Sequence, residues 1–383
     1  MKALVLGTSN SVMREGWLSL TREMAANKGL YYDNQSIGAL PSLYLAYRLQ
    51  DMRLMNGVDR VVIDFCINDQ IHMGSGIYDI DRAEGHYMAA FRQLSQSQML
   101  SKTLVLLFTQ ERFALSGEPC PIIERLKLLC ARFGIRTLDA KALISQAAKA
   151  RGEGIGHAYK DAMHFALPYQ KVIGEEVVRR LRQKPNRIIG PRVWANRRAL
   201  RKIPFACIRS LKLEPTTVHR IENVGTSLAR RDVVSLPQDS HATISGGRWL
   251  LGLFHWTHPN AGAFCLKSRD EERRFHLRRV WLKRLFVFDA LQAPFPLSPA
   301  SEGSGATLHV ANPRDVPYHI LIGQRSSIYD CTDATVDLVD LIGSDLSPQE
   351  LAERVAECHA LCEASLLSRL GRALRNRLLP RKT

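Results

Sequence analysis

The sequence lacks the long apolar run that a membrane-spanning segment needs. No stretch of its 383 residues approaches the roughly 18–20 apolar residues that cross a bilayer. The first apolar run, Ala3–Leu6, indicates a buried strand and is too short for the core of a secretory signal. The sequence therefore predicts a cytoplasmic protein, and its length favours two domains.

Paired cysteine motifs are also missing. The eight cysteines are scattered and include no CxxC pair, so they predict neither a disulfide framework nor a typical zinc site. Cys358 and Cys362 lie one helical turn apart beside His359, but a zinc site usually has two pairs of ligands. We expect these residues to pack on a helix face, and we predict no metal and no other cofactor.

Acidic residues are absent from Val177 to Leu213, where arginines and lysines follow one another, and the chain has a net charge of +16. The last residues, from Arg369 to Lys382, are rich in arginine as well. Two interpretations remain open: a solvated linker and helix face, or a surface that attracts the anionic inner face of a membrane. Nucleic acid is the least favoured partner, because no recognisable binding motif accompanies the charge.

Short apolar segments alternate with amphipathic ones over residues 1–185. The segments that predict strands are Ala3–Leu6, Leu30–Ile37, Val58–Cys66, Thr103–Phe108 and Ile135–Leu138. Helices are predicted over Met13–Asn27, Pro41–Met55, Asp81–Ser101, Pro121–Phe133 and Pro168–Arg182. This alternation predicts a parallel sheet with helices on both faces, which is a three-layer α/β/α sandwich.

The pattern changes after residue 185. Prolines and a glycine punctuate residues 186–215, which we interpret as a basic linker. Residues 216–342 lose the helical period and contain short apolar segments separated by turn residues, which predicts an all-β, sandwich-like domain. Residues 343–383 contain the capping box Ser347-Pro348-Gln349-Glu350 and predict an amphipathic helix with a basic tail.

Three candidate site residues follow the first three predicted strands, at the sheet edge where ligands bind in doubly wound folds. Ser9 follows the first strand, Gly38 the second and Asn68 the third, and Asp161 and His164 precede the last helix. In this set Ser9 is the candidate nucleophile, His164 its base and Asp161 the acid that orients the base. The backbone N–H groups of Ser9 and Gly38 and the side-chain amide of Asn68 are candidate donors of an oxyanion hole.

These residues, in this order, resemble the four sequence blocks of the SGNH/GDSL hydrolases. The resemblance covers residues 1–185 and implies a flavodoxin-like sheet and an acyl-enzyme on Ser9. Two positions depart from the blocks. Thr8 stands where aspartate is usual, in a Gly-Thr-Ser variant similar to that of alginate-type O-acetyltransferases in the same superfamily. Cys66 replaces a glycine and is expected to add bulk beside the oxyanion pocket.

Structural interpretations stand beside the catalytic ones. Ser9 or Ser11 could cap a helix, Ser11 is the second candidate nucleophile, Asn68 could form a turn, and His164 could pack under Phe165. Aromatic residues of the β domain, either a platform for sugar rings or core residues, are Trp249, His255, Trp256 and His258. His72 and His86 are candidates for the mouth of the site.

The expected function is a serine esterase for acyl esters, with acetyl esters of a carbohydrate or polysaccharide as the favoured substrates. An O-acyltransferase in polysaccharide biosynthesis, with the same triad, is the alternative. A catalytically silent protein that binds carbohydrate or a membrane surface is the hypothesis from another class.

Overall fold

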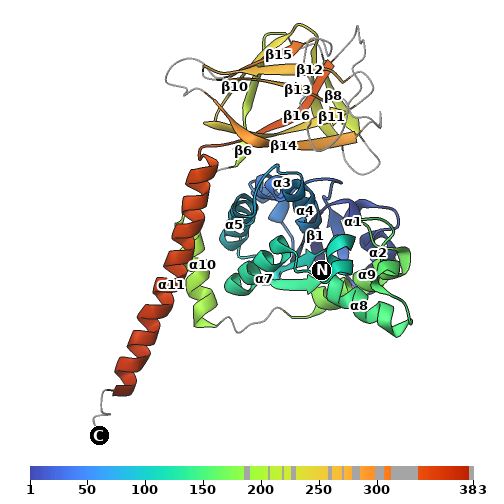
Figure 1. Ribbon diagram of the computed structural model, residues 1–383, viewed down its shortest axis with the longest axis vertical. Helices are drawn as coiled ribbons and strands as arrows, with labels where there is room; N and C mark the ends of the chain where they lie inside the picture. The colour runs from blue at the N-terminus through green and yellow to red at the C-terminus, as the bar shows by residue number, and fades with distance from the viewer. Residues whose placement is uncertain are drawn as a thin grey trace.

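The computed structural model describes residues 1–184, 190–205, 208–217, 220–225, 230–257, 261–269, 271–277, 285–297, 306–311 and 335–378. The chain forms an α/β domain, a β domain stacked on it, and two helices that run along one side of the α/β domain (Figure 1).

A five-stranded sheet lies at the centre of the α/β domain, in the order β2-β1-β3-β4-β5. All neighbouring strands are parallel. The strands are β1 (Lys2–Gly7), β2 (Tyr31–Asn34), β3 (Arg60–Asp64), β4 (Thr103–Leu107) and β5 (Arg136–Asp139). Strand β4 is buried along its whole length and β3 at every residue but Arg60, as expected for strands that helices cover on both faces. The predicted three-layer sandwich is confirmed.

Helices cover the two faces in separate groups. Helix α9 packs against α2 and α8, whereas α5 packs against α3 and α7. The helices of this domain are α1 (Ser9–Val12), α2 (Trp17–Asn27), α3 (Ser42–Arg48), α4 (Cys66–Gly74), α5 (Ile80–Gln96), α6 (Glu111–Ser116), α7 (Pro121–Phe133), α8 (Ala140–Ala150) and α9 (Leu167–Arg182). Three short 3₁₀ turns add η1 (Met52–Met55), η2 (Leu100–Lys102) and η3 (Ile155–Ala158).

Two predicted elements have different bounds in the structure. The helix expected over Met13–Asn27 begins only at Trp17, because the chain turns at Gly16, where a Cβ would lie 2.3 Å from the carbonyl oxygen of Asn10; a separate short helix, α1, precedes the predicted range. The strand expected over Val58–Cys66 ends at Asp64, and Cys66 already begins α4. Asn68 therefore lies in the first turn of a helix.

The described strands of the β domain form two antiparallel sheets, as expected for the sandwich-like domain that the sequence predicted. One sheet contains, in spatial order, β13 (Glu272–His276), β12 (Ala263–Lys267), β15 (Ala306–Ala311), β10 (His241–Ser245) and β7 (Lys212–Pro215). The other contains β14 (Leu285–Pro296), β11 (Trp249–Thr257), β16 (Thr335–Ser344), β9 (Arg230–Pro237) and β8 (Arg220–Gly225), with β6 (Arg209–Ser210) beside β16. The strand predicted over His319–Ile322 lies outside the described residues.

The segment interpreted as a basic linker contains a helix, α10 (Pro191–Lys202), as well as β6 and β7. Proline at the first helical position suits a helix start, and the buried residues Asn196, Ala199 and Leu200 dock α10 on the protein. Helix α11 (Pro348–Leu378) begins at the predicted capping box: Glu350 N–H donates to Ser347 Oγ over 3.1 Å, and Ser347 N–H donates to Glu350 Oε2 over 2.6 Å.

Polar and apolar contacts join the two domains. The hydroxyl of Tyr47 on α3 donates to Asp340 of β16, and the Tyr44 ring lies 5.3 Å from that of Phe254. Arg82 of α5 donates to the carbonyl oxygen of Leu291 over 3.0 Å. Among the described residues, no helix is both long and apolar enough to span a membrane.

Candidate active site

The five predicted site residues lie at the carboxyl edge of the parallel sheet. Ser9 begins α1 immediately after β1, Gly38 lies in the loop after β2, and Asn68 lies on α4 after β3. Asp161 and His164 lie in the loop between η3 and α9. The fold thus brings together residues that are up to 155 positions apart in the sequence.

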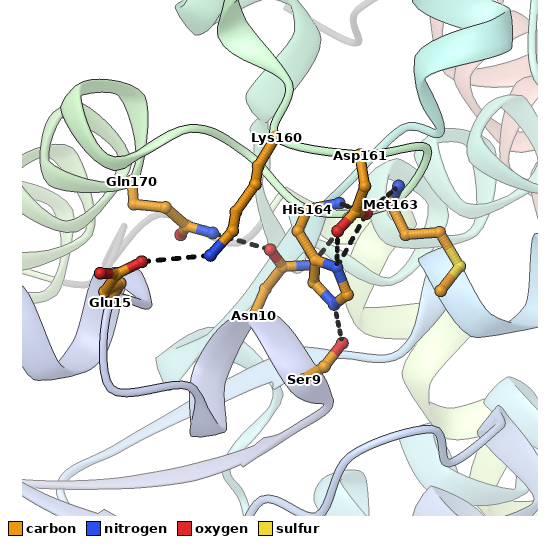
Figure 2. A network of polar contacts seen from close by, with 8 residues as sticks. All are labelled: Ser9, Asn10, Glu15, Lys160, Asp161, Met163, His164 and Gln170. Atoms are coloured by element: carbon orange, nitrogen blue, oxygen red, sulfur yellow. Dashed lines mark hydrogen bonds and ion pairs between the residues drawn. The ribbon is translucent and has the colours of Figure 1, made fainter. Parts of the chain in front are cut away.

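Ser9, His164 and Asp161 form a hydrogen-bonded chain (Figure 2). The Oγ atom of Ser9 lies 2.8 Å from Nε2 of His164. The other ring nitrogen, Nδ1, lies 2.8 Å from each carboxylate oxygen of Asp161. When Nδ1 carries the ring proton and donates it to Asp161, Nε2 presents a lone pair to the Ser9 hydroxyl. This is the arrangement that a serine nucleophile requires.

Asp161 is held in place by its own loop. Its Oδ1 accepts hydrogen bonds from the backbone N–H groups of Met163 (2.9 Å) and His164 (3.0 Å). Partial burial raises the pKa of the Asp161 carboxyl, but these bonds and the His164 ring outweigh burial and bring the pKa below its usual value. Asp161 therefore stays ionised beside the imidazole. About half of its side chain is exposed, and water also favours the carboxylate.

A second chain of amides, which sequence reasoning missed, ties the histidine loop to the serine turn. Asn10 Nδ2 donates to the carbonyl oxygen of Met163 over 3.1 Å, and Gln170 Nε2 donates to Asn10 Oδ1 over 2.8 Å. Gln170 Oε1 accepts from the backbone N–H of Trp17. Figure 2 shows Asn10 and Gln170 beside the triad. Asn10 could have been suspected from its place next to Ser9, but nothing in the sequence marks Gln170 in the middle of α9.

Asp64, at the end of β3, lies buried beneath the serine turn. Its Oδ2 accepts from Ser11 Oγ over 2.7 Å and lies 3.5 Å from the backbone N–H of Thr8. Burial raises the pKa of Asp64 to about 7, although the hydrogen bond from Ser11 and that from the Thr8 backbone lower it. Ser11 also accepts from the indole N–H of Trp17 over 3.0 Å.

The positions of Ser11 and Cys66 correct two expectations. Ser11 caps no helix, because its hydroxyl is engaged with Asp64 and Trp17; α2 instead begins after Gly16 without a side-chain cap. The buried Cys66 thiol lies 3.4 Å from the carbonyl oxygen of Phe108, in the core beside β4. Its bulk is therefore accommodated in the core at the carboxyl end of β4.

Gly38 and Asn68 lie on connected segments of the site. A Cβ atom on Gly38 would have Ser9 Cβ as its nearest neighbour, 4.0 Å away, so the glycine leaves open space in front of the serine. Asn68 is buried, and its Nδ2 donates one hydrogen bond, to the carbonyl oxygen of Leu40 over 3.0 Å. That bond ties α4 to the Gly38 loop. The roles of both residues as oxyanion donors stay predictions.

Other predicted residues lie in the core. His72 and His86 are buried, and therefore do not line the mouth of the site. His255 and Trp256 are also buried, with His255 Nε2 2.8 Å from Asp289, so they provide no platform for a sugar ring; His258 lies outside the described residues. His359 bonds Glu84 over 2.8 Å, and among the described residues no group of histidines, cysteines and carboxylates is placed to hold a metal ion.

A pocket of about 480 Å³ adjoins the histidine loop. Ala162 and Met163, the two residues between Asp161 and His164, form one wall, and residues of α4 and of the β4–α6 segment form the others. The complete lining is Gln70, Ile71, Gly74, Ser75, Gln110, Glu111, Arg112, Leu115, Ala162 and Met163. Sequence analysis did not find this pocket, because its walls come from three separate segments.

Comparison with solved structures places this fold among known ones. A two-domain esterase active on acetylated mannans aligns with a TM-score of 0.50 and 10% identity, over 90% of this chain and 91% of the other. The same esterase co-crystallised with mannopentaose aligns with a TM-score of 0.51 and 12% identity over the same shares. The chain has the fold of this esterase. The likeness extends over both the α/β domain and the β domain, and at this identity it is a likeness of fold. No family model matches the sequence, and neither does any curated protein.

Proposed function

We propose that the protein is a serine esterase of the SGNH/GDSL type. The observation that carries the proposal is the hydrogen-bonded chain from Ser9 through His164 to Asp161 at the carboxyl edge of the sheet. An ionised Asp161 fixes the imidazole tautomer that can take the serine proton. The fold, the order of the residues and the open space beside Ser9 support the same activity.

In this mechanism Ser9 Oγ attacks the ester carbonyl carbon while its proton passes to His164 Nε2. The carbonyl oxygen takes the negative charge, facing the N–H groups of Ser9 and Gly38 and the second amide hydrogen of Asn68. His164 then gives the proton to the leaving alcohol, and the acyl group stays on Ser9. A water molecule, deprotonated by His164, releases the acid and restores the serine.

We propose acetyl esters of a carbohydrate as the substrate class. The structurally similar esterase is described as active on acetylated mannans, which supports the class without extending its substrate to this chain. The pocket beside Met163 is large enough for part of the alcohol that carries the ester, and its lining combines apolar side chains with amides and charges. Such a mixed lining suits a sugar better than a long acyl chain.

An O-acyltransferase is the alternative, since the same acyl-enzyme can pass its acyl group to a sugar hydroxyl. Thr8 is buried next to Ser9. It supports this alternative only through the resemblance of Gly-Thr-Ser to the motif of alginate-type O-acetyltransferases. Adding an oligosaccharide to the acyl-enzyme separates the two activities. A hydrolase releases the same amount of free acid with or without the sugar, whereas a transferase passes the acyl group from Ser9 to a sugar hydroxyl and releases correspondingly less acid.

The deciding experiment measures turnover of p-nitrophenyl acetate by the purified protein. Ser9→Ala and His164→Ala are expected to abolish the burst of nitrophenol and the steady turnover. Ser19→Ala and His157→Ala are matched controls. Ser19 lies on α2 and His157 on η3, and neither belongs to the triad. Equal rates in all five proteins would exclude the esterase and favour a binding protein. A serine-directed phosphonate is expected to label Ser9 and not Ser11.

A further inference from the structure

Helix α10 presents one face of cations and an indole to solvent. Trp194, Arg198, Arg201 and Lys202 are exposed, and their spacing of four, three and one residues places them on the same side of the helix. The Trp194 side chain, with 53% of the residue exposed, is an unusual surface group for a soluble protein. We call these four residues the α10 cationic face.

The opposite side of α10 fixes the helix on the α/β domain. Asn196 Nδ2 donates to the carbonyl oxygen of Arg132 over 2.9 Å, and Arg197 Nε donates to that of Phe133 over 2.7 Å. Leu200 is fully buried, and α10 packs against α5, α7 and α11. The helix is therefore a rigid part of the domain, and the α10 cationic face is a fixed surface.

The three cations of this face have no partner within the described part of the chain. No hydrogen bond or ion pair joins Arg198, Arg201 or Lys202 to another described residue. The arginines near the end of α9 differ, because Arg179 and Arg180 both pair with Glu176. Charges left without a carboxylate on one face, in a segment of the sequence without any acidic residue, suit an anionic partner.

The neighbouring helix is also rich in arginine near its end. Helix α11 runs along α10 and continues beyond it to the C-terminal side (Figure 1). The sequence of this last part of α11 contains Arg369, Arg372, Arg375 and Arg377 and no acidic residue. The backbone therefore places a second arginine-rich segment beyond one end of α10.

We propose that the α10 cationic face docks the protein onto an anionic phospholipid surface. Lysine and arginine side chains are attracted to anionic headgroups, and tryptophan is the side chain that prefers the level of the headgroups, with its ring among the acyl carbons and its N–H in water. A nucleic acid would use the same charges, but an indole without a neighbouring base-reading motif favours the lipid. This proposal is independent of the esterase activity.

Co-sedimentation with vesicles tests the proposal. The full-length protein is expected to bind vesicles of phosphatidylcholine with about one third phosphatidylglycerol, but not vesicles of phosphatidylcholine alone. The variant Arg198→Gln/Arg201→Gln/Lys202→Gln is expected to bind roughly 100-fold more weakly, since each cation near the surface contributes about a factor of five. Added salt should weaken the wild type in the same direction. Trp194→Ala should weaken binding while leaving its salt dependence unchanged.

The matched control removes the same charge elsewhere. Arg22→Gln/Lys28→Gln/Lys149→Gln changes three exposed cations on α2, the turn after it and α8, and should bind like the wild type. Equal loss in both triple variants would mean that net charge alone drives binding and would overturn the proposal. Equal binding to both kinds of vesicle, or none to either, would also overturn it. So would an oligonucleotide that binds through the α10 cationic face more tightly than the anionic vesicles do.

Discussion

Ser9 Oγ lies 2.8 Å from His164 Nε2, although the two residues are 155 positions apart. The distance results from two unrelated turns, one after β1 and one before α9, that meet over the same sheet edge. Asn10 holds both turns together through its bond to the Met163 carbonyl. The relative position of the nucleophile and its base is therefore held by contacts between the two turns as well as by the Ser9–His164 hydrogen bond itself.

Asp161→Asn is expected to lower kcat by roughly 10³–10⁴-fold with little change in KM. An asparagine amide at this position would donate to Nδ1, so the ring proton would move to Nε2, which could then no longer accept the proton of Ser9. Steady-state kinetics on p-nitrophenyl acetate measure both constants. If kcat stays within a few-fold of wild type, the proton of Ser9 has another acceptor.

Asn68→Ala is expected to lower kcat by roughly 10²–10³-fold, the usual effect of one lost oxyanion donor. The same change removes the hydrogen bond to Leu40, so the thermal midpoint should fall as well. The acceptor in this bond is the backbone carbonyl of Leu40, so a side-chain substitution of Leu40 cannot remove the bond on its own. A variant that loses stability but keeps kcat would show that Asn68 only joins α4 to the Gly38 loop.

Gly38→Ala is expected to leave the thermal midpoint unchanged while kcat/KM falls. The added methyl group would meet nothing closer than Ser9 Cβ at 4.0 Å, so the folded protein has room for it. The same methyl group would occupy the space that the substrate needs next to the nucleophile. Thermal denaturation and kinetics of the one variant separate these effects, and an unchanged kcat/KM would place the substrate elsewhere.

The triad was predictable because both of the segments that supply it carry local signals. A strand that ends at a glycine predicts the edge of the sheet, and the Asp-x-x-His spacing already allows the bond between Asp161 and His164. The helix Pro121–Phe133 was likewise predicted to the residue, since Pro121 starts it and Gly134 ends it in the left-handed region at φ 65°. These signals lie within a few residues of the features that they predict.

Contacts between distant segments were not predictable in this way. Gln170 bonds Asn10, which is 160 positions away, and Asp64 bonds Ser11, which is 53 positions away. No local sequence pattern marks such residues. Helix α8 was not predicted, although its buried residues Ala140, Ile144 and Ala148 recur every four positions, as in an amphipathic helix. Helix α10 was interpreted as linker because its many arginines hide the few buried residues that dock it.

Asp64 is expected to make the stability of the protein fall as the pH rises from about 4 to about 7. Burial raises the pKa of Asp64 from its usual 3.8 to about 7, so the folded state keeps the proton over a range in which the unfolded chain has lost it. Asp64→Asn cannot ionise, and its free energy of unfolding should rise relative to wild type by up to about 4 kcal/mol across this window.

Urea denaturation of both proteins at several pH values measures this difference. Asp81→Asn, which changes an exposed carboxylate, is the control and should follow the wild type. Only the difference between the Asp64 variant and wild type is informative, because buried Asp69 also has a raised pKa. Parallel curves for the two proteins would show that Asp64 is already ionised below pH 7 in the folded state.

Gly85→Ala is expected to destabilise the wild type but to stabilise a Leu351→Ala background. Helix α11 lies so close to α5 that a Cβ on Gly85 would come within 2.8 Å of the buried Leu351 side chain, and such overpacking costs roughly 1–3 kcal/mol. Once Leu351 is shortened the clash disappears, and alanine then exceeds glycine in helix propensity by about 1 kcal/mol. Urea denaturation of the four proteins gives the coupling energy. A change of the same sign in both backgrounds would mean that α11 does not pack on α5 in solution.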